Sequence, residues 1–382
     1  MKLDVITGRN GLAAIADSWD GLARLDARDG FFRTYAWYKA WIDHIRPDAE
    51  PFVIVARNAG GEIVGIAPLC RGEYRDLGFR LRSLFWAGRE VVSGDFLDFL
   101  SEPRHRQEVI AAMLDFCERN RERWGLLVLG ELLDGADSYG ALERMAKQGG
   151  LSFRRQEERI CPYIALPASF DEYLATLGSS TRYHIRRRMR DVEKKGGRVE
   201  VHTEPREVAG RLDTLIELHL ARWRQENLPG TMGRPGFAAF LREICLHPPA
   251  GSSCRLYLLA HEERPVAALM AFQFGESMLY YQAGWEPGSA LATLSPAVVL
   301  MAHSIRDAIG EGCRYYEFLR GDEAYKGRWT KTCRKTATVL LARSFPAREF
   351  LRIHAAKDAV KHWLARPGDG KPSAAECVES EA

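Results

Sequence analysis

One succession of secondary-structure signals occurs twice in this chain, and it constrains the fold more than any single motif. The first copy comprises strand-like runs at residues 51–57 and 63–69, further strand-like runs near 84–86 and 96–100, a helix at 104–123 and a strand at 126–129. The second comprises strands at 255–260, 266–274 and 278–284, a helix at 296–309 and a strand at 315–319. The order hairpin, strand, helix, strand indicates a duplicated α/β unit, with chance recurrence of a common layout as the alternative.

The length of 382 residues suits two domains, and the 46% share of apolar residues is enough for packed cores. We predict an N-terminal unit at residues 1–155 and a C-terminal unit at 156–345 that carries the chemistry. Residues 346–382 would form a helix and then a disordered tail, because 366–382 is rich in Pro, Gly, Ser and Glu.

Composition narrows the classes of function. The net charge of +3 is too small to favour nucleic acid as a partner. The eight cysteines include no C-x-x-C pair and mostly lie in apolar segments, so we expect reduced thiols and a cytoplasmic location. The histidines lack an H-E-x-x-H spacing, which predicts no metal. No run of about eighteen apolar residues occurs, which predicts no membrane span, and the N-terminus lacks the pattern of a signal peptide.

The run from Arg320 to Trp329 is the strongest candidate for a site, because it opens abruptly into charge after an apolar strand. Asp322 could accept a proton, while Lys326 and its neighbours could hold an anion. The cationic candidates in this run are Arg320, Lys326 and Arg328. A solvated, salt-bridged loop is the alternative. Glu317, within the strand, could face either a cleft or a salt bridge.

A second candidate is the helix that begins at Ser295 and Pro296, since serine suits the N-cap and proline the first helical position. The preceding loop is small and flexible, and a helix N-terminus attracts anions such as phosphate. The loop residues that could bind a nucleotide-like cofactor are Gly288, Ser289, Thr293 and Ser295. An ordinary capped helix is the alternative. No P-loop or Rossmann glycine motif occurs in the chain.

A third candidate is the basic helix from Thr181 to Lys195, which ends at a pair of glycines. Arginine forms fork-shaped pairs with phosphate, so Arg182 and Arg186 could bind a phosphate-bearing substrate or RNA. A solvated helix face is the alternative.

The run from Tyr315 to Lys326, together with the helix opened by Ser295 and Pro296, resembles the GNAT-type acyltransferases of the CelD-like group. That group is associated with cellulose or other exopolysaccharide biosynthesis, and the resemblance covers about residues 30–345. It implies two tandem GNAT-like units, each a mixed, mostly antiparallel sheet flanked by helices. It also implies acyl transfer from acetyl-CoA or another acyl-CoA to an amine or hydroxyl. The acceptor would be a small molecule or a saccharide, and the exopolysaccharide synthesis machinery would be a partner.

The resemblance assigns roles to the candidate residues. The thioester would lie between strands 278–284 and 315–319, with a backbone N–H on its oxygen. Asp322 would be the first choice of base and Glu317 the second, and Tyr325 would protonate the leaving thiolate. Lys326 would hold a phosphate or an acceptor anion. The loop that leads to Ser295 would bind the pyrophosphate.

Two other functions stay open. The group is similar in plan to the Fem-type aminoacyltransferases, which use aminoacyl-tRNA, and the arginine-rich helix fits such a donor. The chain also lacks the Q/R-x-x-G-x-G/A pyrophosphate loop of typical GNAT proteins. That departure fits a non-catalytic binding or scaffold protein that has kept the fold.

Overall fold

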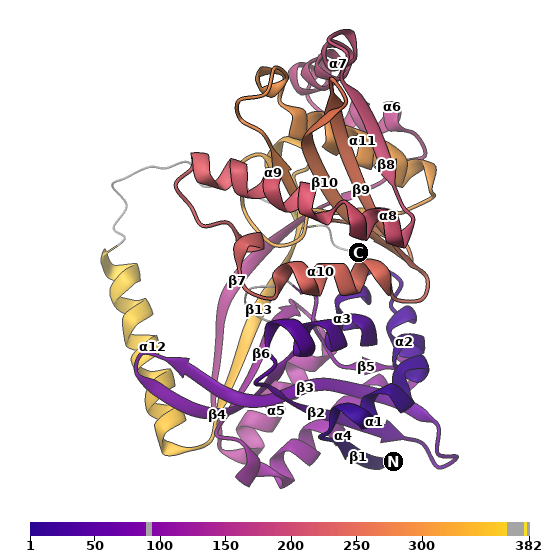
Figure 1. Cartoon of the computed structure of the whole chain (residues 1–382). Helices are drawn as coiled ribbons and strands as arrows, with labels where there is room; N and C mark the ends of the chain where they lie inside the picture. Colours follow the sequence, from indigo (N-terminus) through magenta and orange to yellow (C-terminus); the bar gives the residue numbers. More distant parts are fainter. Residues whose placement is uncertain (89–93, 365–377, 380–382) are drawn as a thin grey trace.

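The computed structural model describes residues 1–88, 94–364 and 378–379. Its strands form one mixed sheet in the order β1-β2-β3-β4-β6-β13-β7-β12-β11-β10-β9-β8, with β5 paired to β3 and β14 to β13. Figure 1 shows the elements of the two halves gathered at opposite ends of the molecule, joined by the long strands β7 and β13. The predicted class, two mixed units flanked by helices, is confirmed.

The N-terminal half contains the predicted hairpin and helix. Its strands are β1 (Lys2–Ile6), β2 (Glu50–Arg57), β3 (Ile63–Asp76), β4 (Phe79–Trp86), β5 (Leu100–Ser101) and β6 (Leu126–Leu133). Its α-helices are α1 (Arg9–Leu12), α2 (Ala16–Arg24), α3 (Tyr35–Ala40), α4 (Arg106–Arg119) and α5 (Asp137–Gly149). The strands β2 and β3 pair antiparallel. Trp37 and Trp41 are fully buried, as expected for core residues.

The C-terminal half repeats the plan. Its strands are β7 (Ser152–Ala165), β8 (Arg198–His202), β9 (Ser252–His261), β10 (Arg264–Phe274), β11 (Ser277–Trp285), β12 (Tyr315–Glu317) and β13 (Thr332–Ala342). Its helices are α6 (Phe170–Thr176), α7 (Ser179–Lys194), α8 (Pro205–Gly210), α9 (Leu212–Gln225), α10 (Phe237–Leu246) and α11 (Pro296–Gly310). Arg211 separates the two neighbouring helices α8 and α9.

Strand β13 crosses between the halves. It pairs antiparallel with β6 along residues 336–342 and with β7 along residues 333–342, so a strand from late in the sequence completes the N-terminal half of the sheet. The predicted boundary between residues 155 and 156 falls inside β7.

Two irregularities of β11 position the site. Hydrogen bonding between β11 and the parallel strand β12 covers only three residue pairs and ends at Leu279 and Glu317. On its other edge, β11 has a bulge against β10 that leaves Tyr281 without a register partner. After Glu317 the chain leaves β11, and Leu319 and Gly321 take left-handed φ values of 58° and 125°. The N–H groups of Phe318 and Gly321 still donate to carbonyl oxygens of β7. The two strands therefore part, and β11 runs on to Trp285.

The helix α11 begins at the predicted residue, although the side chain of Ser295 makes no capping hydrogen bond. Ser295 precedes it with a φ of 55°, and Pro296 occupies the first turn, where a missing N–H costs nothing. The helix packs on β10 and β11 through side chains that are almost fully buried, including Val299, Leu300 and Ile305.

The C-terminal region contains the helix α12 (Phe345–Leu364), seen beside β13 and β4 in Figure 1. Apart from the short strand β14 (Val378–Glu379), the predicted disordered tail lies outside the described residues. No helix in the described ranges is long and apolar enough to cross a lipid bilayer. No cluster of His, Cys, Asp and Glu suited to a metal occurs in the same ranges.

Candidate active site

A cavity of about 330 Å³ lies where β11 and β12 part. Residues from several elements line it: Tyr280 and Trp285 come from β11, Ser295 and Met301 from α11 and its N-cap, and Tyr325 from the loop after β12. The remaining lining residues are Arg222, Ala283, Ala292, Pro296, Ala297, Val298, Arg328 and Trp329. The helix started by proline and the tyrosine of the charged run therefore border one cavity.

Tyr325 is held at this cavity by a second tyrosine. Its hydroxyl donates a hydrogen bond of 3.5 Å to the hydroxyl of Tyr280. Burial, and after it the neighbouring Tyr280, raises the pKa of Tyr325 above the usual value of 10.0. The phenol is thus protonated at neutral pH.

The loop before α11 divides into residues that reach the cavity and residues that do not. Ser295 and Ala292 line it. Gly288 and Thr293 are exposed at the surface outside the lining. The Oγ atom of Ser289 is buried without a hydrogen-bond partner among the described residues.

Two arginine side chains, Arg222 and Arg328, line the cavity. Arg328, from the charged run, is exposed and was expected as an anion ligand. Arg222 comes from the end of α9 and was not found by sequence reasoning. Its guanidinium lies 4.5 Å from the ring centroid of Trp285 and 3.6 Å from a carboxylate oxygen of Glu226. No local motif marks Arg222, because only the packing of α9 on β11 brings it here.

Asp322 and Lys326 lie outside the cavity lining. Asp322 is exposed and has no ion pair or hydrogen bond from its side chain with the described residues. Lys326 is buried, and its Nζ atom donates to the carbonyl oxygen of Arg320 at 2.8 Å and to that of Leu319 at 3.3 Å. It also pairs with Glu323 at 2.9 Å. These contacts close the loop on itself, so the ammonium is directed into the protein.

Glu317 and Arg320 belong to two buried charge networks. The Oε1 atom of the fully buried Glu317 accepts hydrogen bonds from Arg28 at 3.0 Å and from Arg334 at 2.9 Å. Burial raises the pKa of Glu317, although both arginines oppose this. Arg320 forms ion pairs with Asp95 and Glu131. Of the two environments that the sequence allowed for Glu317, a cleft or a salt bridge, the structure shows the salt bridge. The charge of Arg320 is compensated by Asp95 and Glu131.

Arg186 lines a separate groove of about 660 Å³ between α7 and α11. The cationic residues of this basic groove are Arg186, Arg190, Arg198 and Arg306, and Glu193 is its only carboxylate among the described residues. Arg186 also pairs with Asp171 at 2.7 Å. Arg182 lies outside the groove and donates to the carbonyl oxygen of Ala175. The structure therefore does not bring the two helix arginines into the cavity of Tyr325.

Comparisons with known proteins identify one segment of the chain and its fold. Residues 179–327 match the model of the acetyltransferase (GNAT) domain, a segment that runs from α7 to Gly327 and contains β11, α11 and β12. A search of curated proteins found no match.

Solved structures show the same fold at low identity. FemX is 12% identical over 92% of this chain and 99% of its own, with a TM-score of 0.62. The C-terminal domain of a putative lysylphosphatidylglycerol synthetase from Agrobacterium fabrum is 9% identical over 90% of this chain and 96% of its own, with a TM-score of 0.55. The chain therefore shares the fold of FemX and carries, at residues 179–327, a segment that matches the GNAT acetyltransferase domain.

Proposed function

We propose that this protein transfers an acyl group, such as acetyl, from acyl-coenzyme A to an amine or hydroxyl acceptor. The observation that supports this most is the cavity at the parting of β11 and β12, bounded by a helix N-terminus and the partly buried Tyr325. A thioester needs a slot for its arm, donors for its oxygen and a proton for its leaving sulfur. In this proposal the cavity is the slot, free backbone N–H groups of β11 are the donors, and Tyr325 provides the proton.

The donor would enter between β11 and the loop after β12. No strand in the described ranges pairs with that edge of β11 beyond Leu279, so backbone N–H groups there are available to the thioester oxygen. The phosphates would lie toward the start of α11, where the helix dipole favours negative charge. Arg222 and Arg328 would add positive charge beside them.

The transfer step would use Tyr325 as the acid. The acceptor nitrogen or oxygen attacks the thioester carbon, the C–S bond breaks, and the departing sulfur takes the phenolic proton of Tyr325. Asp322 would accept the proton that the acceptor loses. It is exposed on the adjoining loop and carries no competing ion pair with the described residues. We assign Glu317 to positioning instead, since both arginines occupy its Oε1 atom.

Thermal-shift titrations of the full chain test the donor. A ligand that binds only the folded state stabilises it by about 2.7 kcal/mol at a hundredfold excess over its dissociation constant. We expect acetyl-coenzyme A or a longer acyl-coenzyme A to raise the melting temperature. Val298→Trp should abolish that rise, because the indole would fill the cavity. An absence of any shift with all the coenzyme A esters would contradict the proposal.

Aminoacyl-tRNA is the second candidate donor, and the basic groove between α7 and α11 favours it. RNA binding depends on phosphate contacts and therefore falls steeply with salt, whereas coenzyme A presents only a few charges. Titrations at two salt concentrations with tRNA and acetyl-coenzyme A separate the two donors. Donor binding without transfer to any acceptor would point to the non-catalytic alternative.

The acceptor and pathway are proposals that come from the sequence resemblance. We propose a small-molecule or saccharide acceptor and a role in exopolysaccharide biosynthesis. Product analysis after incubation with labelled acetyl-coenzyme A and candidate saccharides tests both.

A further inference from the structure

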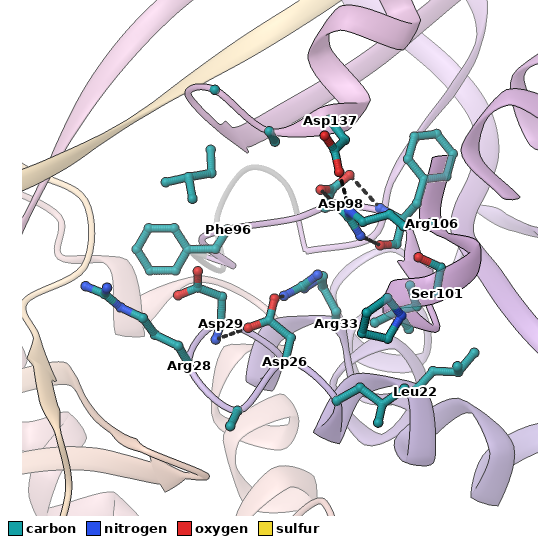
Figure 2. A pocket seen from close by; sticks show the side chains of 18 of the residues that line it. Leu22, Asp26, Arg28, Asp29, Arg33, Phe96, Asp98, Ser101, Arg106 and Asp137 are labelled. Atoms are coloured by element: carbon teal, nitrogen blue, oxygen red, sulfur yellow. Dashed lines mark hydrogen bonds and ion pairs between the residues drawn. The ribbon is translucent and has the colours of Figure 1, made fainter. Parts of the chain in front are cut away.

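A second cavity, of about 560 Å³, lies between the N-terminal half and the start of β11 (Figure 2). The loop after α2 supplies Asp26, Arg28 and Arg33, and the segment that leads to α4 supplies Asp98, Ser101 and Arg106. The start of α5 adds Asp137, and Glu276 comes from the turn before β11. The proposed acyl-transfer step uses none of these side chains.

The charges around this second cavity are paired. Arg33, only 4% exposed, forms an ion pair with Asp26. Arg106 pairs with Asp98, and its Nε atom lies 3.5 Å from Asp137. Burial alone would raise the pKa of Asp26, but the pair with Arg33 outweighs it and lowers that pKa.

The remaining wall charges are also matched. Asp29 accepts two hydrogen bonds from Arg334, at 2.7 and 2.8 Å. Arg28 donates to Glu317, and Glu276 accepts from Arg314. A bound anion would face these carboxylates and a bound cation these guanidinium groups, so the cavity favours a ligand without net charge.

Three buried polar atoms on the wall have no hydrogen-bond partner among the described residues. They are Oγ of Ser101, Nη2 of Arg28 and Nε of Arg33. The guanidinium of Arg28 lies 3.7 Å from the ring centroid of Tyr315, and that of Arg33 pairs with Asp26, so the hydroxyl of Ser101 is the group left for a ligand. Ser101 is 8% exposed and lines the cavity beside Arg106, as Figure 2 shows. Buried donors without partners are costly, and a ligand that offers oxygen atoms would relieve that cost. The half-exposed Leu25, together with Leu22 and Pro103, provides an apolar part of the wall.

We propose that this cavity binds a neutral, polyhydroxylated part of the acceptor, such as a sugar unit. Hydroxyl groups both donate and accept hydrogen bonds, so they match a wall where paired carboxylates keep spare lone pairs and Ser101 keeps an unpaired hydroxyl. The C–H face of a sugar ring would contact the apolar wall. The inference rests on the proposed acyl transfer, since Arg28 joins the cavity through Glu317 to β12, the strand whose end opens the donor cavity.

Ligand-observed NMR on the full chain, without acyl donor, tests the inference. The probes are cellobiose and maltose as neutral sugars, glucosamine as a cation and glucuronate as an anion. We expect saturation transfer to the neutral sugars and weaker transfer to both charged probes. Ser101→Leu should weaken sugar binding about tenfold, which corresponds to about 1.4 kcal/mol. If Ser101→Leu does not fold, Pro103→Trp at the exposed rim serves the same purpose.

The donor-cavity variant Val298→Trp is the matched control and should leave sugar binding within about twofold, since the two cavities share no lining residue. Sugar binding that is absent in the wild-type chain, or that survives a folded Ser101→Leu or Pro103→Trp variant unchanged, would overturn the inference. Either result leaves the donor titrations unaffected, so a failure here is distinguishable from a failure of the proposed acyl transfer.

Discussion

The hydroxyl of Tyr325 donates a hydrogen bond to the hydroxyl of Tyr280 across the mouth of the donor cavity, at 3.5 Å. The two residues come from different elements, a loop after β12 and the strand β11. A long hydrogen bond of this kind is easily exchanged, because a leaving thiolate placed between the two phenols would be a stronger acceptor than Tyr280.

Tyr325→Phe should therefore lower kcat by about a hundredfold, the lower range for loss of a general acid, while donor affinity changes by less than about threefold. Steady-state kinetics together with donor titration measure both. Tyr280→Phe is the matched control, since it removes a hydroxyl from the same cavity but not the proposed proton donor. Equal losses in the two variants would contradict the special role of Tyr325.

The pH dependence of kcat gives a separate test of Tyr325. Its pKa is raised above 10.0 by burial, so the phenol keeps its proton from neutral pH up to pH 10. Ionisation of Tyr325 should therefore cause no decline of kcat between pH 8 and pH 10. The wild type and Tyr325→Phe should show the same pH dependence across this window. A decline within that window that disappears in the variant would show that the phenol ionises earlier than the structure indicates.

Asp322→Asn should lower turnover sharply and leave donor affinity nearly unchanged, since the exposed side chain lies outside the donor cavity. Its effect on the free energy of unfolding should be within about 0.5 kcal/mol, as for other surface substitutions. Rates under saturating donor, with chemical denaturation as the stability control, measure both quantities. Unchanged turnover would remove Asp322 from the mechanism.

Glu317→Gln, unlike Asp322→Asn, should lower the free energy of unfolding. It removes the carboxylate that accepts from Arg28, whereas Arg334 keeps its ion pair with Asp29. Leaving the partly buried Arg28 without its charge partner should cost about 1–3 kcal/mol. Denaturant unfolding measures the loss, with Asp322→Asn as the control from the same segment. A change below about 1 kcal/mol would show that water can readily solvate the arginine left without its partner.

Sequence patterns predicted the local features of this site. The serine and proline at 295 and 296 marked the start of α11 correctly, because proline suits the first turn of a helix. Ser295 precedes the helix in a left-handed conformation, and its side chain makes no capping hydrogen bond. The strand predicted to reach Leu319 ends at Glu317, since Leu319 adopts a left-handed backbone. Arg222 was missed because it reaches the cavity only through the packing of α9, which no local pattern encodes.

His219 allows a prediction about stability against pH. It is 1% exposed, and burial lowers its pKa from 6.5 to about 4, although its hydrogen bond with the Ala283 carbonyl opposes this. On acidification, His219 is protonated near pH 6.5 in the unfolded chain but only near pH 4 in the folded protein. Stability is therefore lost as pH falls through this window, by about 3 kcal/mol at 1.36 kcal/mol per unit.

Unfolding free energies of the wild type and His219→Gln at pH 7 and pH 4.5 measure this contribution. The variant should show a shallower loss of stability on acidification, because glutamine does not titrate. The exposed His247→Gln is the control and should retain the slope of the wild type. Equal slopes in wild type and His219→Gln would assign the acid sensitivity to other groups.

The position of β13 makes the two halves interdependent. Val339, Leu340 and Leu341 are fully buried between β6 and β7, in the core of the N-terminal half, yet they follow the GNAT-matching segment in the sequence. A fragment of residues 1–155 would lack this strand and most of β7, and would expose an unpaired edge of β6. We expect neither this fragment nor residues 156–382 to unfold cooperatively alone, whereas co-expression should restore a stable complex. Calorimetry and size-exclusion chromatography measure these outcomes, and an independent cooperative transition of residues 1–155 would show that β13 is dispensable to that half.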